Sequence, residues 1–220
     1  MIARMTLKTF SDEAMIKFSD GNGDPHVVGE WEKIHHRFGM AGEGQATIIE
    51  QYLKGRVLYV GCGAVTDSGD QKIENLAGLA HELVVIDIMS ESIGKAKAKY
   101  GDLPNVEFKV ADARNLSKFE DESFDLILAL GLFAHVSLKD VPTVLAEFWR
   151  VCRCGGVAVV TNSTRHFIDV YLDAAFGCGF ELCIENEGDC QASSTGRRYL
   201  LGFTKPSELP AVPSSQQGNI

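Results

Sequence analysis

The chain has 220 residues, of which 45% are hydrophobic and 23% are charged. These are ordinary values for a globular protein of about one domain, so a wholly disordered chain is excluded. Acidic residues outnumber basic ones by 30 to 21, for a net charge of -9, which disfavours nucleic acid or an anionic membrane as partner and favours a small molecule.

Apolar runs and cysteines indicate the compartment. No apolar run reaches the ~18 residues of a membrane-spanning helix, and the first ten residues lack the apolar core of a signal peptide. The six cysteines form no Cys-x-x-Cys pair, and Cys152 and Cys154 are too close together, with no His-x3-His nearby, for a zinc site. We expect a cytoplasmic protein with reduced, mostly buried thiols and no metal.

Three helical patterns come first in the chain. Apolar residues at helical spacing predict helices near residues 14–18, 25–38 and 48–53, the last ended by Gly55. We interpret residues 1–44 as an N-terminal helical lid and residues 45–204 as a ligand-binding domain.

From residue 56 onward, strand-like runs alternate with helical patterns. Runs rich in β-branched and aromatic residues predict buried strands at 56–60, 83–86, 106–110, 124–130 and 157–161. Helical patterns lie between them at 71–79, 90–100 and 139–152. This alternation predicts a parallel sheet with helices on both faces and right-handed crossovers.

The end of the domain has a different order. A helical pattern at 167–176 precedes two strand-like runs, 180–185 and 198–203, which are joined by a polar segment without a helix, so we expect them to pair antiparallel. The predicted fold is therefore α/β, with a mostly parallel seven-stranded sheet and an antiparallel C-terminal strand pair. Residues 205–220, rich in Pro and Ser, are expected to form a disordered tail.

Glycines and carboxylates follow the first three predicted strands, where an open parallel sheet binds its ligands. Gly61 and Gly63 follow the first strand and would let the backbone approach a ligand closely. Asp87 ends the second strand, where a carboxylate can accept both hydroxyls of an adenosyl ribose. Asp112 follows the third strand and could accept a hydrogen bond from an adenine amino group.

Each of these residues also has a structural interpretation. The glycines could close a tight strand–helix turn, Asp87 could cap the next helix, although Ser90 is better placed, and Asp112 could cap the turn at Asn115. Their occurrence in this order favours ligand binding.

In this pattern the chain resembles the class I S-adenosylmethionine-dependent methyltransferases. The resemblance spans residues 45–203 and rests on five segments: VLYVGCG (57–63), LVVIDIMSESIGKAKAKYG (83–101), VEFKVADARNL (106–116), FDLILALGLFAHV (124–136) and RVCRCGGVAVVTNS (150–163). It implies S-adenosyl-L-methionine (AdoMet) as cofactor. By position, the implied binding residues are Gly61, Cys62, Gly63, Asp87, Ile88, Asp112, Ala113 and Leu130.

The chain departs from the family pattern at the first turn. Tyr59 stands where the family usually has an acid, and Val65 where a third glycine is common; Asp67, Ser68 or Asp70 could replace the acid. A dinucleotide-binding dehydrogenase is the main rival, but its third glycine would fall at Thr66.

Candidate acceptor-site residues lie in the lid and after the fourth and fifth strands. His135 is a candidate general base, because histidine titrates near neutral pH, and His35 is a second candidate; packing is the alternative for both. Further side chains could wall the pocket or orient the acceptor, with core or surface positions as the alternative: Trp31, Arg37, Phe133, Asn162 and Arg165.

The sequence thus predicts a methyltransferase that acts on O, N or C of a small molecule. Two alternatives stay open: non-methyl chemistry on AdoMet that releases methylthioadenosine, and a non-catalytic AdoMet-binding scaffold. The acceptor and the oligomeric state are not specified by the sequence.

Overall fold

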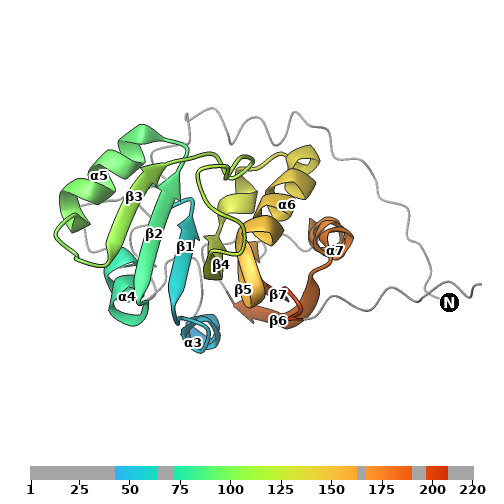
Figure 1. The fold of residues 1–220 in the computed structure, drawn as a ribbon. Coiled ribbons are helices and arrows are strands. Elements are labelled where there is room, and N and C mark those ends of the chain that lie inside the picture. The colour runs from blue at the N-terminus through green and yellow to red at the C-terminus, as the bar shows by residue number, and fades with distance from the viewer. Residues whose placement is uncertain (1–42, 64–71, 163–166, 190–196, 208–220) are drawn as a thin grey trace, which may run out of the picture.

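A computed structural model describes residues 43–63, 72–162, 167–189 and 197–207. Seven strands form one sheet in the order β3-β2-β1-β4-β5-β7-β6, which can be followed in Figure 1. They are β1 (Arg56–Val60), β2 (Glu82–Asp87), β3 (Val106–Val110), β4 (Phe124–Leu130), β5 (Cys152–Asn162), β6 (Glu181–Asp189) and β7 (Arg197–Thr204).

The first five strands are parallel, and β7 runs antiparallel to both of its neighbours, β5 and β6. Successive strands are added on one side of β1 up to β3 and on its other side from β4 onward, so β1 pairs with both β2 and β4. This is the topological switch point beyond which open α/β sheets bind ligands. The predicted fold class is confirmed.

Helices cover both faces of the sheet, because alternate side chains of the apolar strands point to opposite faces. One core contains Leu58 and Val60 and is covered by α6 (Val141–Val151) and α7 (Ile168–Cys178). The other contains Val57 and Tyr59 and is covered by α3 (Glu43–Glu50), α4 (Lys72–Leu79) and α5 (Ser90–Tyr100).

The predicted 139–152 helix and 157–161 strand differ from the observed elements. The helix begins as a 3-10 turn, Leu138–Asp140, and α6 follows with Pro142 in its first turn, where a missing N–H costs little. β5 begins already at Cys152, which pairs with Phe124 through an irregular register.

The predicted start of the tail, residue 205, is too early in the chain. The Lys205 side chain is buried, and its Nζ donates to the carbonyls of Trp149 (3.2 Å) and Cys152 (3.0 Å). The N–H of Lys205 also donates to Gly156 O. Lys205 therefore belongs to the sheet domain. Residues 208–220 and most of the predicted lid, residues 1–42, lie outside the described residues.

Candidate functional site

The turn after β1 is held by glycines in a left-handed conformation. Gly61 has φ +76° and Gly63 has φ +66°, a region that L side chains rarely adopt. The N–H of Gly61 donates to Ile86 O of β2. Among the described residues, no atom lies within 4 Å of where a Cβ of Gly63 would stand. Within the described residues, nothing fills the space beside the Gly63 backbone.

Asp87 links this turn to the end of β2. It is only 8% exposed, and its Oδ2 accepts from the N–H of Gly63 at 3.0 Å. Its Oδ1 accepts from the N–H of Met89 at 2.9 Å. Asp87 does not cap α5, whose N-cap position is Met89 and has no side-chain cap. Because a carboxylate oxygen has two lone pairs, Oδ1 can still accept a hydrogen bond from a ligand hydroxyl.

Cys62 lies buried between the two glycines, with its Sγ 3.7 Å from Asp87 Oδ2. Burial, and then the charge of Asp87, raise the pKa of this thiol to about 12. The thiol is therefore protonated at neutral pH and donates to the carboxylate. The prediction of mostly buried thiols is wrong in part, because Cys154 and Cys183, near the starts of β5 and β6, are exposed.

Apolar side chains are exposed next to Asp87. Ile88 and Met89 are 58% and 56% exposed, and Val110, the register partner of Asp87, is 41% exposed. Exposed apolar side chains of this size at the carboxyl edge of a parallel sheet suit a planar, apolar ligand group.

Asp112 follows β3 and is held by Arg114. Both its oxygens accept from Arg114 Nε at 3.1 Å, and Oδ2 also accepts from Nη2 at 2.7 Å. These hydrogen bonds lower the pKa of Asp112. Asp112 also shapes the turn: its Oδ1 accepts from the N–H of Arg114, and its carbonyl from the N–H of Asn115. The neighbouring Ala113 is buried.

The end of β4 is fixed by a buried hydroxyl. Leu130 is 5% exposed, and the next residue, Gly131, has φ +81°. The N–H of Gly131 donates to Oγ1 of Thr161, which is fully buried on β5, at 2.9 Å. The β4 and β5 ends are thereby held together.

Phe133 and His135 lie beyond this point in different environments. Phe133 is 2% exposed and its ring packs 5.0 Å from that of Tyr171 and 6.4 Å from that of Phe148. Its ring is part of the core and offers almost no surface to an acceptor. His135 is exposed at the same edge of the sheet.

The other predicted acceptor residues are not placed. Trp31, His35, Arg37 and Arg165 lie outside the described residues, and Asn162 ends β5 but its side chain is not described.

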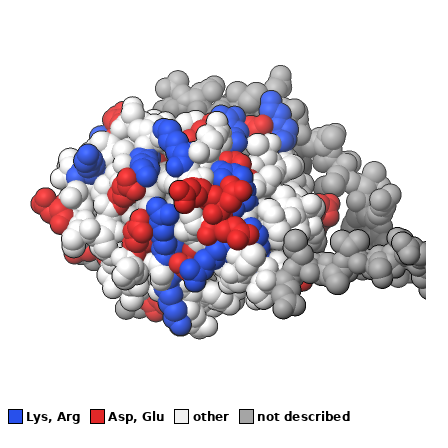
Figure 2. Space-filling view, viewed as in Figure 1, with Lys and Arg blue, Asp and Glu red and all other residues white. Residues whose placement is uncertain are grey.

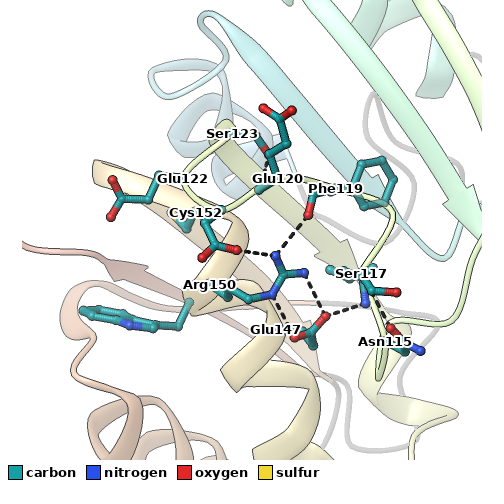
Figure 3. Close-up of polar contacts among 12 residues, drawn as sticks. Asn115, Ser117, Phe119, Glu120, Glu122, Ser123, Glu147, Arg150 and Cys152 are labelled. Carbon is teal, nitrogen blue, oxygen red and sulfur yellow. Dashed lines mark hydrogen bonds and ion pairs between the residues drawn. The ribbon is translucent and has the colours of Figure 1, made fainter.

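The segment after β3 is attached to α6 by a network that the sequence reasoning missed (Figure 3). Glu147 accepts from the N–H of Leu116 at 2.5 Å and pairs with Arg150 at 3.1 Å. Arg150 in turn donates to Phe119 O at 3.0 Å and to Asp121 at 2.6 Å. The sequence signal that could have predicted this network is a Glu and an Arg three residues apart on a predicted helix. The network fixes the segment that carries Asp112.

Charges on the face drawn in Figure 2 are mixed: acidic and basic side chains lie next to one another over the described part of that face. Within the described ranges, no group of three or more His, Cys, Asp or Glu side chains is arranged to hold a metal ion. No helix there has the length and apolar character needed to cross a membrane.

The chain is similar in sequence to known methyltransferases. Residues 58–160 match the family model described as a methyltransferase domain. A phosphatidylethanolamine N-methyltransferase of Cereibacter sphaeroides is 34% identical over 113 residues, which cover 49% of this chain and 50% of that protein. A trans-aconitate 2-methyltransferase of Deinococcus radiodurans is 30% identical over 136 residues, 60% of this chain and 48% of that protein. The chain thus spans about half the length of these relatives.

Solved structures share the fold. The N-methyltransferase NodS of Bradyrhizobium japonicum, in complex with S-adenosyl-L-homocysteine, aligns with a TM-score of 0.63 and 18% identity, over 88% of this chain and 97% of that one.

Proposed function

We propose that this chain carries a class I S-adenosylmethionine-dependent methyltransferase domain, binds AdoMet as its cofactor, and transfers a methyl group to O, N or C of a small-molecule acceptor. The match of residues 58–160 to a methyltransferase domain supports the proposal. The observation that carries the proposal is the buried Asp87 carboxylate, which accepts from the Gly63 amide and keeps an acceptor position on Oδ1. Asp87 ends β2, the strand next to β1 at the switch point of the sheet, where a ribose would need it.

Four groups of residues would hold the donor. Gly61, Cys62 and Gly63 would contact its methionyl part, and Asp87 its ribose. Ile88 would cover the adenine, and Asp112 and the Ala113 amide would read its edge. The backbone at Leu130 would face the methionyl amino group. The open backbone at Gly63 and the exposed apolar surface of Ile88 support this assignment.

The sulfonium of AdoMet supplies an already activated methyl group, so the protein's main task is alignment of the acceptor. Positioning of this kind can supply about 7 to 11 kcal/mol of barrier reduction. We propose His135, exposed at the carboxyl edge, as the base that removes a proton where the acceptor must lose one. His35 remains a second proposed base.

The acceptor is proposed as a class only. The names of the two relatives include an amine-bearing lipid and a carboxylic acid, so the acceptor atom stays open among O, N and C. The net charge of -9 supports an enzyme that acts without nucleic acid. The free cysteines among the described residues support a cytoplasmic location.

The test is mass spectrometry of the ligands bound to the purified protein and released after incubation with AdoMet. We expect co-purified AdoMet or S-adenosylhomocysteine, and S-adenosylhomocysteine formed with a methylated acceptor from a metabolite extract. Methylthioadenosine formed without an acceptor would replace this proposal with non-methyl chemistry. Absence of any adenosyl ligand, together with no thermal shift on adding one, would refute the donor site.

A further inference from the structure

Both oxygens of Asp112 are engaged by Arg114. Its Oδ1 accepts from the N–H and the Nε of Arg114, and its Oδ2 from the Nε and the Nη2 of the same residue. Three N–H groups of Arg114 thus contact the carboxylate, and the Nε–H is shared between its two oxygens. An amino group that approaches Asp112 therefore competes with Arg114 for the carboxylate.

Asp87 differs from Asp112 in this respect. Its Oδ1 accepts only from the N–H of Met89 among the contacts of the described residues, so a ligand hydroxyl can bind there without displacing anything. The two carboxylates at the carboxyl edge thus differ. Oδ1 of Asp87 has an acceptor position open to a ligand, whereas Arg114, from the same loop, contacts both oxygens of Asp112.

Arg114 has a second partner across the site. Its Nη1 donates to Asp140 Oδ2 at 3.1 Å, just before α6, and the Arg114 side chain is 47% exposed. The guanidinium can therefore leave Asp112 without losing every ion pair. Because Arg114 is exposed, its pair with Asp112 is also weak enough for a ligand to displace.

We propose that Arg114 is a latch on the donor site: it closes Asp112 when the site is empty, and moves onto Asp140 alone when an adenosyl ligand binds. Asp112 then accepts from the purine amino group. This inference rests on the proposed function, because it takes the adenosyl donor as the ligand. It makes Arg114 a positioning residue that sets donor affinity and selects a purine with an amino group.

The test measures the affinity for S-adenosyl-L-homocysteine by isothermal titration calorimetry on the full chain and three variants. Arg114→Met removes the latch and should tighten binding by about two- to fivefold, the range of an exposed ion pair. Asp140→Asn removes the second partner, so Arg114 leaves Asp112 less readily and binding should weaken by a similar factor. The double variant should match Arg114→Met, because Asp140 acts only through Arg114.

Two controls accompany these variants. Arg153→Met removes an exposed arginine that pairs with Asp125 at the opposite edge of the sheet and should leave the affinity unchanged. S-inosyl-L-homocysteine carries an oxygen in place of the amino group, and Arg114→Met should not tighten its binding, because that oxygen gains nothing from a free Asp112.

The opposite signs of the two single variants distinguish a latch from a structural clamp. Weaker binding in both Arg114→Met and Asp140→Asn, or no change in either, would overturn the latch while leaving the donor site intact. Failure of the unmodified chain to bind S-adenosyl-L-homocysteine would refute the proposed function itself, and the latch with it.

Discussion

Replacement of Asp87 by Asn is expected to weaken adenosyl binding far more than it weakens the fold. The variant keeps the shape of the side chain but removes the charge that a ribose hydroxyl would meet at Oδ1. A hydrogen bond to a charged group contributes about 1.5 to 3 kcal/mol, so the Kd for S-adenosylhomocysteine should rise by about 10- to 150-fold.

The same substitution also disturbs the turn after β1. The N–H groups of Gly63 and Met89 both donate to this carboxylate, and an amide can accept only through its one oxygen. One of the two donors is left without its acceptor, at about 1 to 3 kcal/mol. Since domains of this kind have about 5 to 15 kcal/mol of stability, the variant should stay folded.

Calorimetric titration and urea denaturation of the same samples separate the two effects. Asp102→Asn is the matched control, because Asp102 is an exposed carboxylate in the turn before β3, at the other edge of the sheet. A Kd for Asp87→Asn within twofold of the unmodified protein, with folding intact, would refute the assignment of Asp87 to the ribose.

Four further predictions concern the turn, the thiols, the chain end and the catalytic edge. Gly63→Ala forces a side chain to φ +66°, so urea denaturation should show a loss of about 1 to 2 kcal/mol, and an unchanged midpoint would contradict the left-handed turn. Burial raises the pKa of the Cys152 thiol from 9.0 to about 12; because the unfolded thiol loses its proton first, the free energy of unfolding should fall as pH rises above 9, and less steeply in Cys152→Ala. Lys205→Met leaves two carbonyls without their donor, which should cost about 1 to 3 kcal/mol in urea denaturation; a loss below about 0.5 kcal/mol, typical of a surface site, would contradict this. His135→Asn should lower kcat by about 10²- to 10⁴-fold with donor affinity unchanged, and an unchanged kcat would exclude His135 as base.

The strands were the part of the fold most visible in the sequence. β1 and β4 have the predicted bounds, because buried parallel strands form continuous apolar runs between polar segments. β3 also has its predicted bounds, but the prediction that it is buried was wrong, because it is the edge strand of the sheet and none of its residues is buried. The start of β5 was missed because Cys152 pairs with Phe124 through a register shift, which no local pattern encodes. Lys205 was assigned to the tail because its partners, the carbonyls of Trp149 and Cys152 and the carboxylate of Glu122, meet it only in the folded chain.

The sequence predicted the residues of the donor site only where they lie at the end of a strand. Gly61 directly follows β1 and Asp87 is the last residue of β2, so their proximity follows from the parallel pairing of the two strands. Arg114 was not visible as a site residue, because its second partner, Asp140, lies 26 residues later on another element. Phe133 was a candidate pocket residue from its position after β4, but the 3-10 turn directs its ring into the core beside Tyr171.

The central claim is that an adenosyl donor binds at the carboxyl edge of β1 and β2. A crystal structure of the chain with S-adenosyl-L-homocysteine tests it most directly. The account predicts ribose hydroxyls within hydrogen-bond distance of Asp87 and the methionyl part against Gly61 and Gly63. A ligand bound elsewhere on the molecule, or a ribose held by another side chain while Asp87 contacts only Gly63 and Met89, would contradict it.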